Sequence, residues 1–470
     1  MLTYALLTMF VLFFSVYVWK DWYKTLCALI IMMAVVGHGS MPRAMFGITG
    51  LNLFNLLMFL VLMAWLVAKK REQLQWDMPS KLNKLLLLYL FIVIIGIIRY
   101  ATNIDVVLAY SDEIGWPFPT VEETFIDRLI NSFKWTLPGL LLFIGCNSRE
   151  RFKWGVVSLI LLYLILAILV IRWMPLGLLV DGEALQRRAA RVLGRELGYY
   201  RTNLSVMLAG AFWMILNAKY FFGKKHLLLF YGMAGICFLA MFLTGGRGGI
   251  LAWVVVGTIV SFVKYRKYII LAPPLVALVL INVPSVQDRL MMGFGDSAEV
   301  DESNLGTISA GRTILWPLIL DEVAEKPLFG YGYWGIITSG VSVESYLNTG
   351  FAYSHPHNAY LQTLIDNGVI GSLPILLFYL LVVKYAWSLF RDNRSDIYVL
   401  AGGTAFVVVV SVLVASFTGQ SFYPEERSVG LWCAIGLMLR VYVDRLNSNH
   451  LIKGHTGEKD AKIYREQWTT

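Results

Sequence analysis

The chain has 470 residues, of which 57% are hydrophobic and only 15% are charged, and its mean hydropathy is +0.64. Soluble domains carry about 25% charged residues, so this composition excludes a water-soluble globular protein. The formal net charge of +9 is spread over several short loops, and this distribution does not indicate a nucleic-acid partner.

Apolar runs long enough to cross a lipid bilayer as a helix recur along the whole chain. They predict an all-α polytopic membrane protein with about 12–13 transmembrane helices and one large, partly helical loop outside the membrane. The first run lacks a small-residue cleavage site and further spans follow it, so we expect no removable targeting segment. The expected spans cover residues 2–18, 26–36, 51–68, 85–98, 129–146, 154–174, 204–218, 227–243, 250–263, 269–281, 369–383, 397–415 and 429–442.

Every second connection between these spans is rich in Lys and Arg, and such short loops usually face the cytoplasm. The basic loops cover residues 69–71, 149–153, 219–225, 264–267 and 384–394. The alternate connections are therefore expected on the periplasmic side. They cover residues 101–127, 175–200, 245–246, 284–354 and 418–426.

The four cysteines all lie within or at the ends of predicted spans, and their spacing predicts neither a disulfide framework nor a metal site.

This topology predicts four parts of the chain. The four parts are an N-terminal transmembrane region over 1–283 that contains a periplasmic arginine-rich segment at 175–203, a large periplasmic loop over 284–356, C-terminal transmembrane helices over 357–445 and a cytoplasmic tail over 446–470.

The periplasmic segment 175–203 carries arginines on the side where basic residues should be scarce. Arg187, Arg191 and Arg195 are spaced at i, i+4 and i+8, so a helix would project them from one face. The planar guanidinium group can bind phosphate through two hydrogen bonds, and we expect these side chains to contact a phosphate group. The alternative is a solvated amphipathic helix whose arginines reach lipid headgroups.

Arg247 stands in the run Thr-Gly-Gly-Arg-Gly-Gly, where a predicted span emerges on the same side. A charge near membrane depth is energetically unfavourable and often marks a substrate or ion pathway. The flanking glycines would let backbone and ligand approach closely. The run lacks the Lys-Ser/Thr pair of a nucleotide phosphate loop, and a topological anchor is the alternative role for Arg247.

The large loop ends where the chain re-enters the membrane, and two of the six histidines lie there. Imidazole accepts protons near neutral pH, which makes His357 a candidate general base. His355 precedes Pro356, which restricts its backbone to extended geometry, and we expect it to be dispensable for chemistry. No cysteine or carboxylate completes a metal site with these histidines, and a structural cap of the following helix is the remaining alternative. Earlier in the loop, the pattern over 313–325 predicts a helix that Pro327 ends.

These motifs resemble the O-antigen ligase and Wzy-type polymerase superfamily of bacterial surface-polysaccharide assembly, most strongly over 244–371. The run around Arg247 resembles the small-residue-plus-arginine turn of the family, and 309–332 resembles its outer loop. His357-Asn358, nine further residues, then Gly368 and Gly371 match its His-Asn…Gly-x-x-Gly signature. Upstream, Thr202-Asn203 stands where the family often has Pro-Asn.

The resemblance implies a GT-C-like membrane glycosyltransferase in the inner membrane whose active site faces the periplasm. It would transfer a glycan from undecaprenyl diphosphate to an acceptor hydroxyl without a metal or other cofactor. A metal-dependent enzyme that uses nucleotide sugars is disfavoured, because no Asp-x-Asp pair occurs on the outer side. The resemblance implies catalytic roles for His357 and Arg247. The substrate-binding residues expected with them are Arg191, Arg187, Arg195, Arg312, Asn358, Asn203, Tyr331 and Tyr333.

Within the family we expect a polymerase of O-antigen or exopolysaccharide repeat units, because nothing in the sequence points to a lipid A partner. The alternative is a ligase that transfers the finished chain to the lipid A core of lipopolysaccharide, and a third relative transfers glycan to protein. A flippase or transporter from another class should show internal repeats, which the sequence lacks. The expected partners are a lipid-linked glycan donor, a glycan or lipid A core acceptor, membrane lipids, a chain-length regulator and a flippase.

Overall fold

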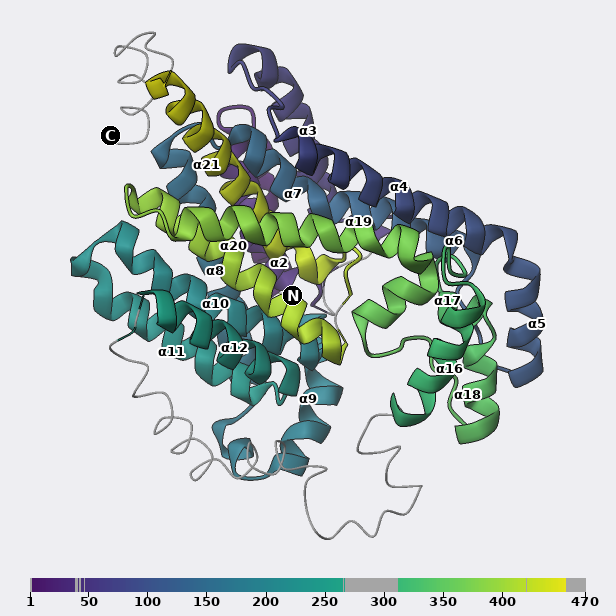
Figure 1. Cartoon of the computed structure of the whole chain (residues 1–470). Coiled ribbons are helices and arrows are strands. Elements are labelled where there is room, and N and C mark those ends of the chain that lie inside the picture. The colour runs from purple at the N-terminus through teal and green to yellow at the C-terminus, as the bar shows by residue number, and fades with distance from the viewer. Residues whose placement is uncertain are drawn as a thin grey trace.

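The computed structural model describes residues 2–38, 41, 44–45, 47–264, 266, 312–419 and 421–453. Long apolar helices make up most of this part of the chain, which is therefore an all-α polytopic membrane protein (Figure 1). Six of the described helices are long and apolar enough to cross a membrane. They are α3 (Leu53–Arg71), α4 (Ser80–Thr102), α8 (Arg149–Trp173), α12 (Arg247–Lys264), α19 (Ala359–Phe390) and α20 (Asp396–Ala415), which continues into η5 (Ser416–Thr418).

Each predicted span within the described residues coincides with a helix. The predicted span over 269–281 lies outside the described residues. The remaining spans correspond to α1 (Leu2–Tyr17), α2 (Trp22–Val36), α7 (Asn131–Gly145), α10 (Arg201–Phe222), α11 (Leu227–Leu243) and α21 (Val429–Lys453).

Short elements connect the long helices. The helix predicted in the large loop is α16 (Arg312–Glu325), and it ends before Pro327 as expected. With α17 (Gly335–Thr338) and α18 (Val341–Thr349) it forms a cluster beside α5 (Ile104–Ile114) (Figure 1). The other short elements are β1 (Ala44–Met45) paired antiparallel with β2 (Ile48–Thr49), α6 (Val121–Thr124), η1 (Phe125–Ile130), η2 (Leu176–Leu179), α9 (Gly182–Leu197), η3 (Lys224–His226) and η6 (Glu426–Ser428).

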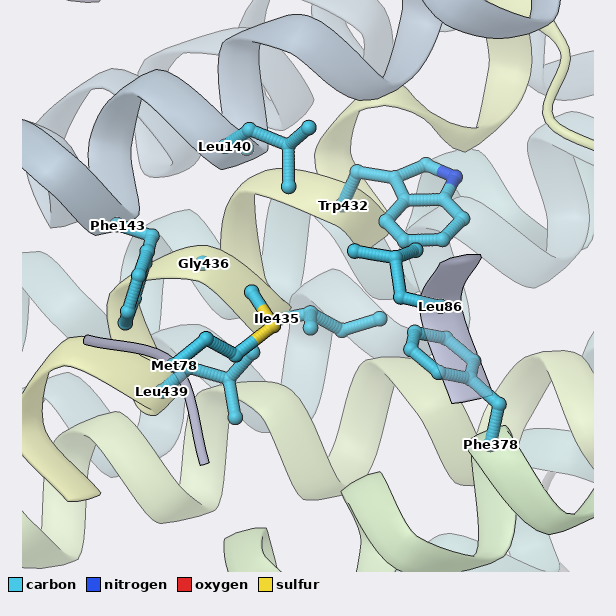
Figure 2. Close-up of a pocket in the computed structure, with 10 residues that line it drawn as sticks. Met78, Leu86, Leu140, Phe143, Phe378, Trp432, Ile435, Gly436 and Leu439 are labelled. Atoms are coloured by element: carbon cyan, nitrogen blue, oxygen red, sulfur yellow. The ribbon is translucent and has the colours of Figure 1, made fainter. Parts of the chain in front are cut away.

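The long helices pack in a few close pairs. α10 packs against α11, α12 and α20, α19 packs against α20 and α4, and α7 packs against α21. Glycines make the last pair close, because a Cβ at Gly436 would lie 2.0 Å from the carbonyl oxygen of Gly139. A small cavity beside this contact is apolar, so it offers no group for chemistry (Figure 2). It is lined by Met78, Leu86, Gly139, Leu140, Phe143, Phe378, Trp432, Ile435, Gly436 and Leu439.

A break in α19 joins the large loop to the membrane helices. Gly368 has φ +60° and ψ −169°, which opens the helical hydrogen-bond ladder around it. The loop residues Tyr331 and Gly332 donate their N–H groups to the carbonyls of Ile365 (2.8 Å) and Asp366 (2.7 Å). In return, the N–H groups of 369 and 370 donate to the carbonyls of 327 (2.8 Å) and 328 (3.1 Å). This joint fixes the loop at the end of α16.

Side chains reinforce the same joint. The carboxylate of Asp366 accepts hydrogen bonds from the N–H of Gly335 (2.7 Å) and the hydroxyl of Tyr423 (2.9 Å). From α4, the guanidinium of Arg99 donates to the carbonyls of Phe329 and Gly330. Because α16 immediately precedes this segment, the joint sets the position of Arg312 at the start of that helix.

Candidate active site

The glycine-rich run before α12 brings three helix ends together. A Cβ at Gly246 would lie 2.3 Å from the hydroxyl oxygen of Ser205, and one at Gly249 would lie 2.5 Å from the Ser205 backbone, both on α10. A Cβ at Gly248 would lie 2.3 Å from the hydroxyl oxygen of Thr418 in η5. The glycines therefore allow these helices to pack closely. The sequence had instead suggested that they allow a ligand to approach closely.

Three arginines occupy the first positions of three helices at this meeting point: Arg201 in α10, Arg247 in α12 and Arg312 in α16. Arg247 is close enough to the other two for their like charges to repel. Burial, and then the charge of Arg247, lowers the pKa of Arg312. Sequence reasoning included Arg201 in the arginine-rich segment but did not single it out as a site residue.

None of these three arginines forms an ion pair with a carboxylate in the part of the chain that the structure describes. One terminal nitrogen of Arg201 and the Nε atom of Arg312 are buried there without a hydrogen-bond partner. Helix N-termini add further positive potential and free N–H groups. Guanidinium groups and helix N-termini are the usual ligands of phosphate groups, so this cluster is suited to bind a multiply charged anion.

His357 lies against the cluster. Burial, and then the positive charge of Arg312, lowers its pKa, which keeps the imidazole neutral near pH 7. Arg312 also donates to the carbonyl of Thr418 (3.3 Å), and a Cβ at the neighbouring Gly419 would lie 3.8 Å from the Nδ1 atom of His357. A neutral imidazole next to an anion site can accept a proton from a nucleophile whose attack releases the bound anion as the leaving group.

Asn358 has a structural role that the geometry shows directly. It is the N-cap of α19, and its side-chain oxygen accepts hydrogen bonds from the N–H groups of Tyr360 (2.9 Å) and Leu361 (3.2 Å). The indole of Trp316 on α16 donates to the carbonyl of Pro356 (2.9 Å). These contacts hold the segment that carries His357 between α16 and α19. A substrate contact by Asn358 remains a prediction.

The arginines of α9 differ from those of the cluster in their ion pairs. The expected one-sided helix is present, with Leu185, Ala189, Leu193 and Leu197 on its buried face. On the exposed face, Arg187 pairs with Glu183 and Arg195 pairs with Glu196 (2.7 Å), while Arg191 is exposed. The charge of Arg247 acts on Arg201 and on Arg312. A phosphate role for the α9 arginines therefore stays a prediction.

The two loop tyrosines expected to bind sugars are buried. The hydroxyl of Tyr331 donates to Glu322 on α16, and Tyr333 is only 1% exposed. The Tyr333 ring lies 5.1 Å from the guanidinium of Arg128 and 4.8 Å from the ring of Tyr423. Such burial argues against stacking on a sugar. Asn203, also expected at the site, is buried in the first turn of α10, two residues after Arg201.

A second charged group, missed by sequence reasoning, acts on the first of the two histidines. Glu425 pairs with Arg128 (3.0 Å) and with Arg427 (2.8 Å). Burial alone would raise the pKa of Glu425, but the charges of Arg427 and Arg128 outweigh burial and lower it. The electrostatic field of this group reaches His355. The available signal was that these charges lie in or beside connections predicted to be periplasmic.

The fold and this site define a multi-pass membrane protein with an arginine and histidine cluster where several of its helices begin. Residues 232–376 match the family model described as O-Antigen ligase, and this range contains Arg247, Arg312 and His357. The resemblance of the chain to the O-antigen ligase superfamily is thereby confirmed.

Several known proteins are similar in sequence to parts of this chain. An uncharacterized protein of Haemophilus influenzae is 24% identical over 47% of this chain and 58% of its own length. An O-antigen ligase of Pseudomonas aeruginosa is 27% identical over 28% of this chain and 31% of its own length. A ComP-specific O-oligosaccharyltransferase of Acinetobacter baylyi is 30% identical over 22% of this chain and 19% of its own length. Each alignment therefore spans less than two thirds of the relative.

Proposed function

We propose that this chain is a glycosyltransferase of the O-antigen ligase type, which transfers a glycan from undecaprenyl diphosphate to an acceptor hydroxyl. The observation that carries this proposal is the cluster of Arg201, Arg247 and Arg312, without carboxylate partners among the described residues, beside a neutral His357. A ligase is favoured over the polymerase expected from the sequence, because the matching family and the Pseudomonas aeruginosa relative are both described as O-antigen ligases.

In the proposed reaction, the acceptor oxygen attacks the anomeric carbon of the donor glycan. A new glycosidic bond forms, and the bond from that carbon to the diphosphate oxygen breaks. The acceptor proton passes to His357, which the lowered pKa keeps ready to receive it. The electron pair leaves with the diphosphate, whose growing negative charge the arginines stabilise. The step needs no metal, because the three guanidinium groups supply the positive charge.

The proposed location is the inner membrane, with the arginine cluster on the periplasmic side. The basic loops support this orientation, because they lie at the opposite ends of the long helices from Arg201 and Arg247. Cysteines introduced at the exposed positions Gln75 and Glu344 test it in a background without the four native cysteines. An impermeant thiol reagent should label Glu344→Cys in intact cells and leave Gln75→Cys unlabelled, and labelling of Gln75→Cys would overturn the orientation.

A deletion strain tests the proposed reaction. For a ligase, gels of surface polysaccharide should show full-length chains that stay on the carrier lipid and no chains on lipopolysaccharide. Single repeat units without long chains would instead identify a polymerase. Normal lipopolysaccharide together with loss of a glycosylated protein would identify a protein acceptor, as the name of the Acinetobacter baylyi relative describes for that protein. No change in any glycan would refute a role in glycan transfer.

A further inference from the structure

The backbone of His357 is held in an unfavourable conformation. Its φ is +53°, in the left-handed region that residues other than glycine rarely adopt. The N–H group of His357 donates a hydrogen bond of 2.8 Å to the Nδ1 atom of His355, two residues earlier. This bond closes a small turn around Pro356 and stabilises the left-handed conformation at His357.

The imidazole of His355 is itself fixed by its surroundings. It is half-buried, and the charges of Arg427, Glu425 and Arg128 act on it. Burial, and then the charges of His357 and Arg427, lowers the pKa of His355 to about 3. The Nδ1 atom therefore stays unprotonated and able to accept the hydrogen bond throughout the physiological range. The hydrogen bond from the Trp316 indole to the Pro356 carbonyl also holds the turn.

We infer that His355 is a positioning residue, whose Nδ1 atom holds the backbone turn that directs the His357 imidazole toward Arg312 and the anion site. The inference rests on the proposed function in one respect, since it takes His357 as the base. It revises the sequence expectation that His355 is dispensable. A proline between the two histidines fits this role, because its fixed φ pre-forms half of the turn.

Substitutions of His355 that remove, displace or restore the hydrogen-bond acceptor test the inference. The side-chain oxygen of asparagine can take the place of Nδ1, whereas that of glutamine reaches the place of Nε2. His355→Ala and His355→Gln should therefore lower the turnover number about ten- to a hundredfold, as small misplacements of a catalytic group do. His355→Asn should stay within about threefold of the wild type, because it restores the bond but cannot act as a base at neutral pH.

Turnover is measured with purified full-length protein added to membranes of the deletion strain, which hold the accumulated donor and its acceptor. Affinity for undecaprenyl diphosphate should be equal in all three variants, because the arginines are unchanged. Inactive His355→Asn would overturn the inference and point to proton transfer by His355. Wild-type turnover in His355→Ala, or equal turnover in His355→Asn and His355→Gln, would overturn it as well.

Hydrogen exchange separates failure of this inference from failure of the proposed function. The amide of His357 should be protected in the wild type and in His355→Asn, and it should exchange at least tenfold faster in His355→Ala and His355→Gln. This readout does not depend on activity. If His357→Ala kept normal turnover, the proposed base would be wrong, while the exchange pattern would still decide whether His355 holds the turn. Equal exchange in all four proteins would overturn the positioning role.

Discussion

Replacing Arg247 by methionine should change activity and stability in opposite directions. Methionine keeps most of the aliphatic stem of the side chain but removes the charge that meets Arg201 and Arg312. Loss of one guanidinium contact to the leaving diphosphate should cost about 3–4 kcal/mol of transition-state stabilisation. Since each 1.36 kcal/mol is a factor of ten, turnover should fall roughly a hundred- to a thousandfold.

The same change should stabilise the protein when no donor is bound. Two like-charge repulsions disappear, each worth well under 1 kcal/mol after screening by solvent, since Arg247 is half-buried. We expect a melting temperature about 1–2 °C above that of the wild type in detergent without lipid donor. The stabilisation that added undecaprenyl diphosphate gives the wild type should be largely lost in the variant.

Both quantities are measured on the purified protein, turnover with membranes of the deletion strain and stability by thermal unfolding with and without undecaprenyl diphosphate. Arg172→Gln is the control, because Arg172 is an exposed arginine in the last turn of α8. It should leave turnover and the response to the lipid unchanged. The reasoning fails if Arg247→Met keeps wild-type turnover, or if it loses activity together with several degrees of melting temperature.

Three further predictions concern the same site. Arg201→Gln should lower turnover about a hundredfold, whereas Arg187→Gln, which removes an exposed partner of Glu183, should change it less than about threefold; the reverse result would assign the diphosphate to α9. Because burial and Arg312 lower the pKa of His357, the acidic limb of the pH–rate profile should lie below the ordinary histidine range, and Arg312→Gln should move that limb to higher pH; an unmoved limb would mean that another group is the base. Gly249→Ala should destabilise the protein by about 1–3 kcal/mol, because its Cβ meets the Ser205 backbone at 2.5 Å, whereas Gly235→Ala at an exposed position of α11, where a Cβ meets nothing within 4 Å, should stabilise by up to about 1 kcal/mol; thermal unfolding compares the two, and equal effects would refute the packing role.

Hydropathy predicted the membrane helices because span length and apolar composition are local properties. α19 shows where this reasoning stops. The predicted span began at 369, directly after Gly368, whereas the helix begins at Ala359. The first turns of α19 carry polar residues, among them Asp366, which binds the loop, so an apolar-run criterion could not include these turns. The break at Gly368 depends on hydrogen bonds to the segment 327–332, which no local pattern reveals.

The site was only partly predictable for a similar reason. His357 stood out by residue type and position, but the association of Arg201, Arg247 and Arg312 depends on how three distant helix ends pack. The spacing of the α9 arginines could not show which role they have, because a surface helix and a ligand-binding helix share that spacing. One local signal was available, since Glu183 lies four residues before Arg187, a spacing that favours an ion pair within the helix.

The joint between α19 and the loop also has a consequence for biosynthesis. The carbonyls of 365 and 366 and the N–H groups of 369 and 370 all find partners in the loop. In lipid, unpaired backbone groups cost several kcal/mol each, so α19 is poorly suited to enter the bilayer alone. Ribosomes make the loop residues 327–332 before α19, so these partners are already outside the ribosome when the helix emerges. Folding of the segment 327–332 against α19 therefore has to accompany stable insertion of this helix, which couples the two events in the final third of the chain.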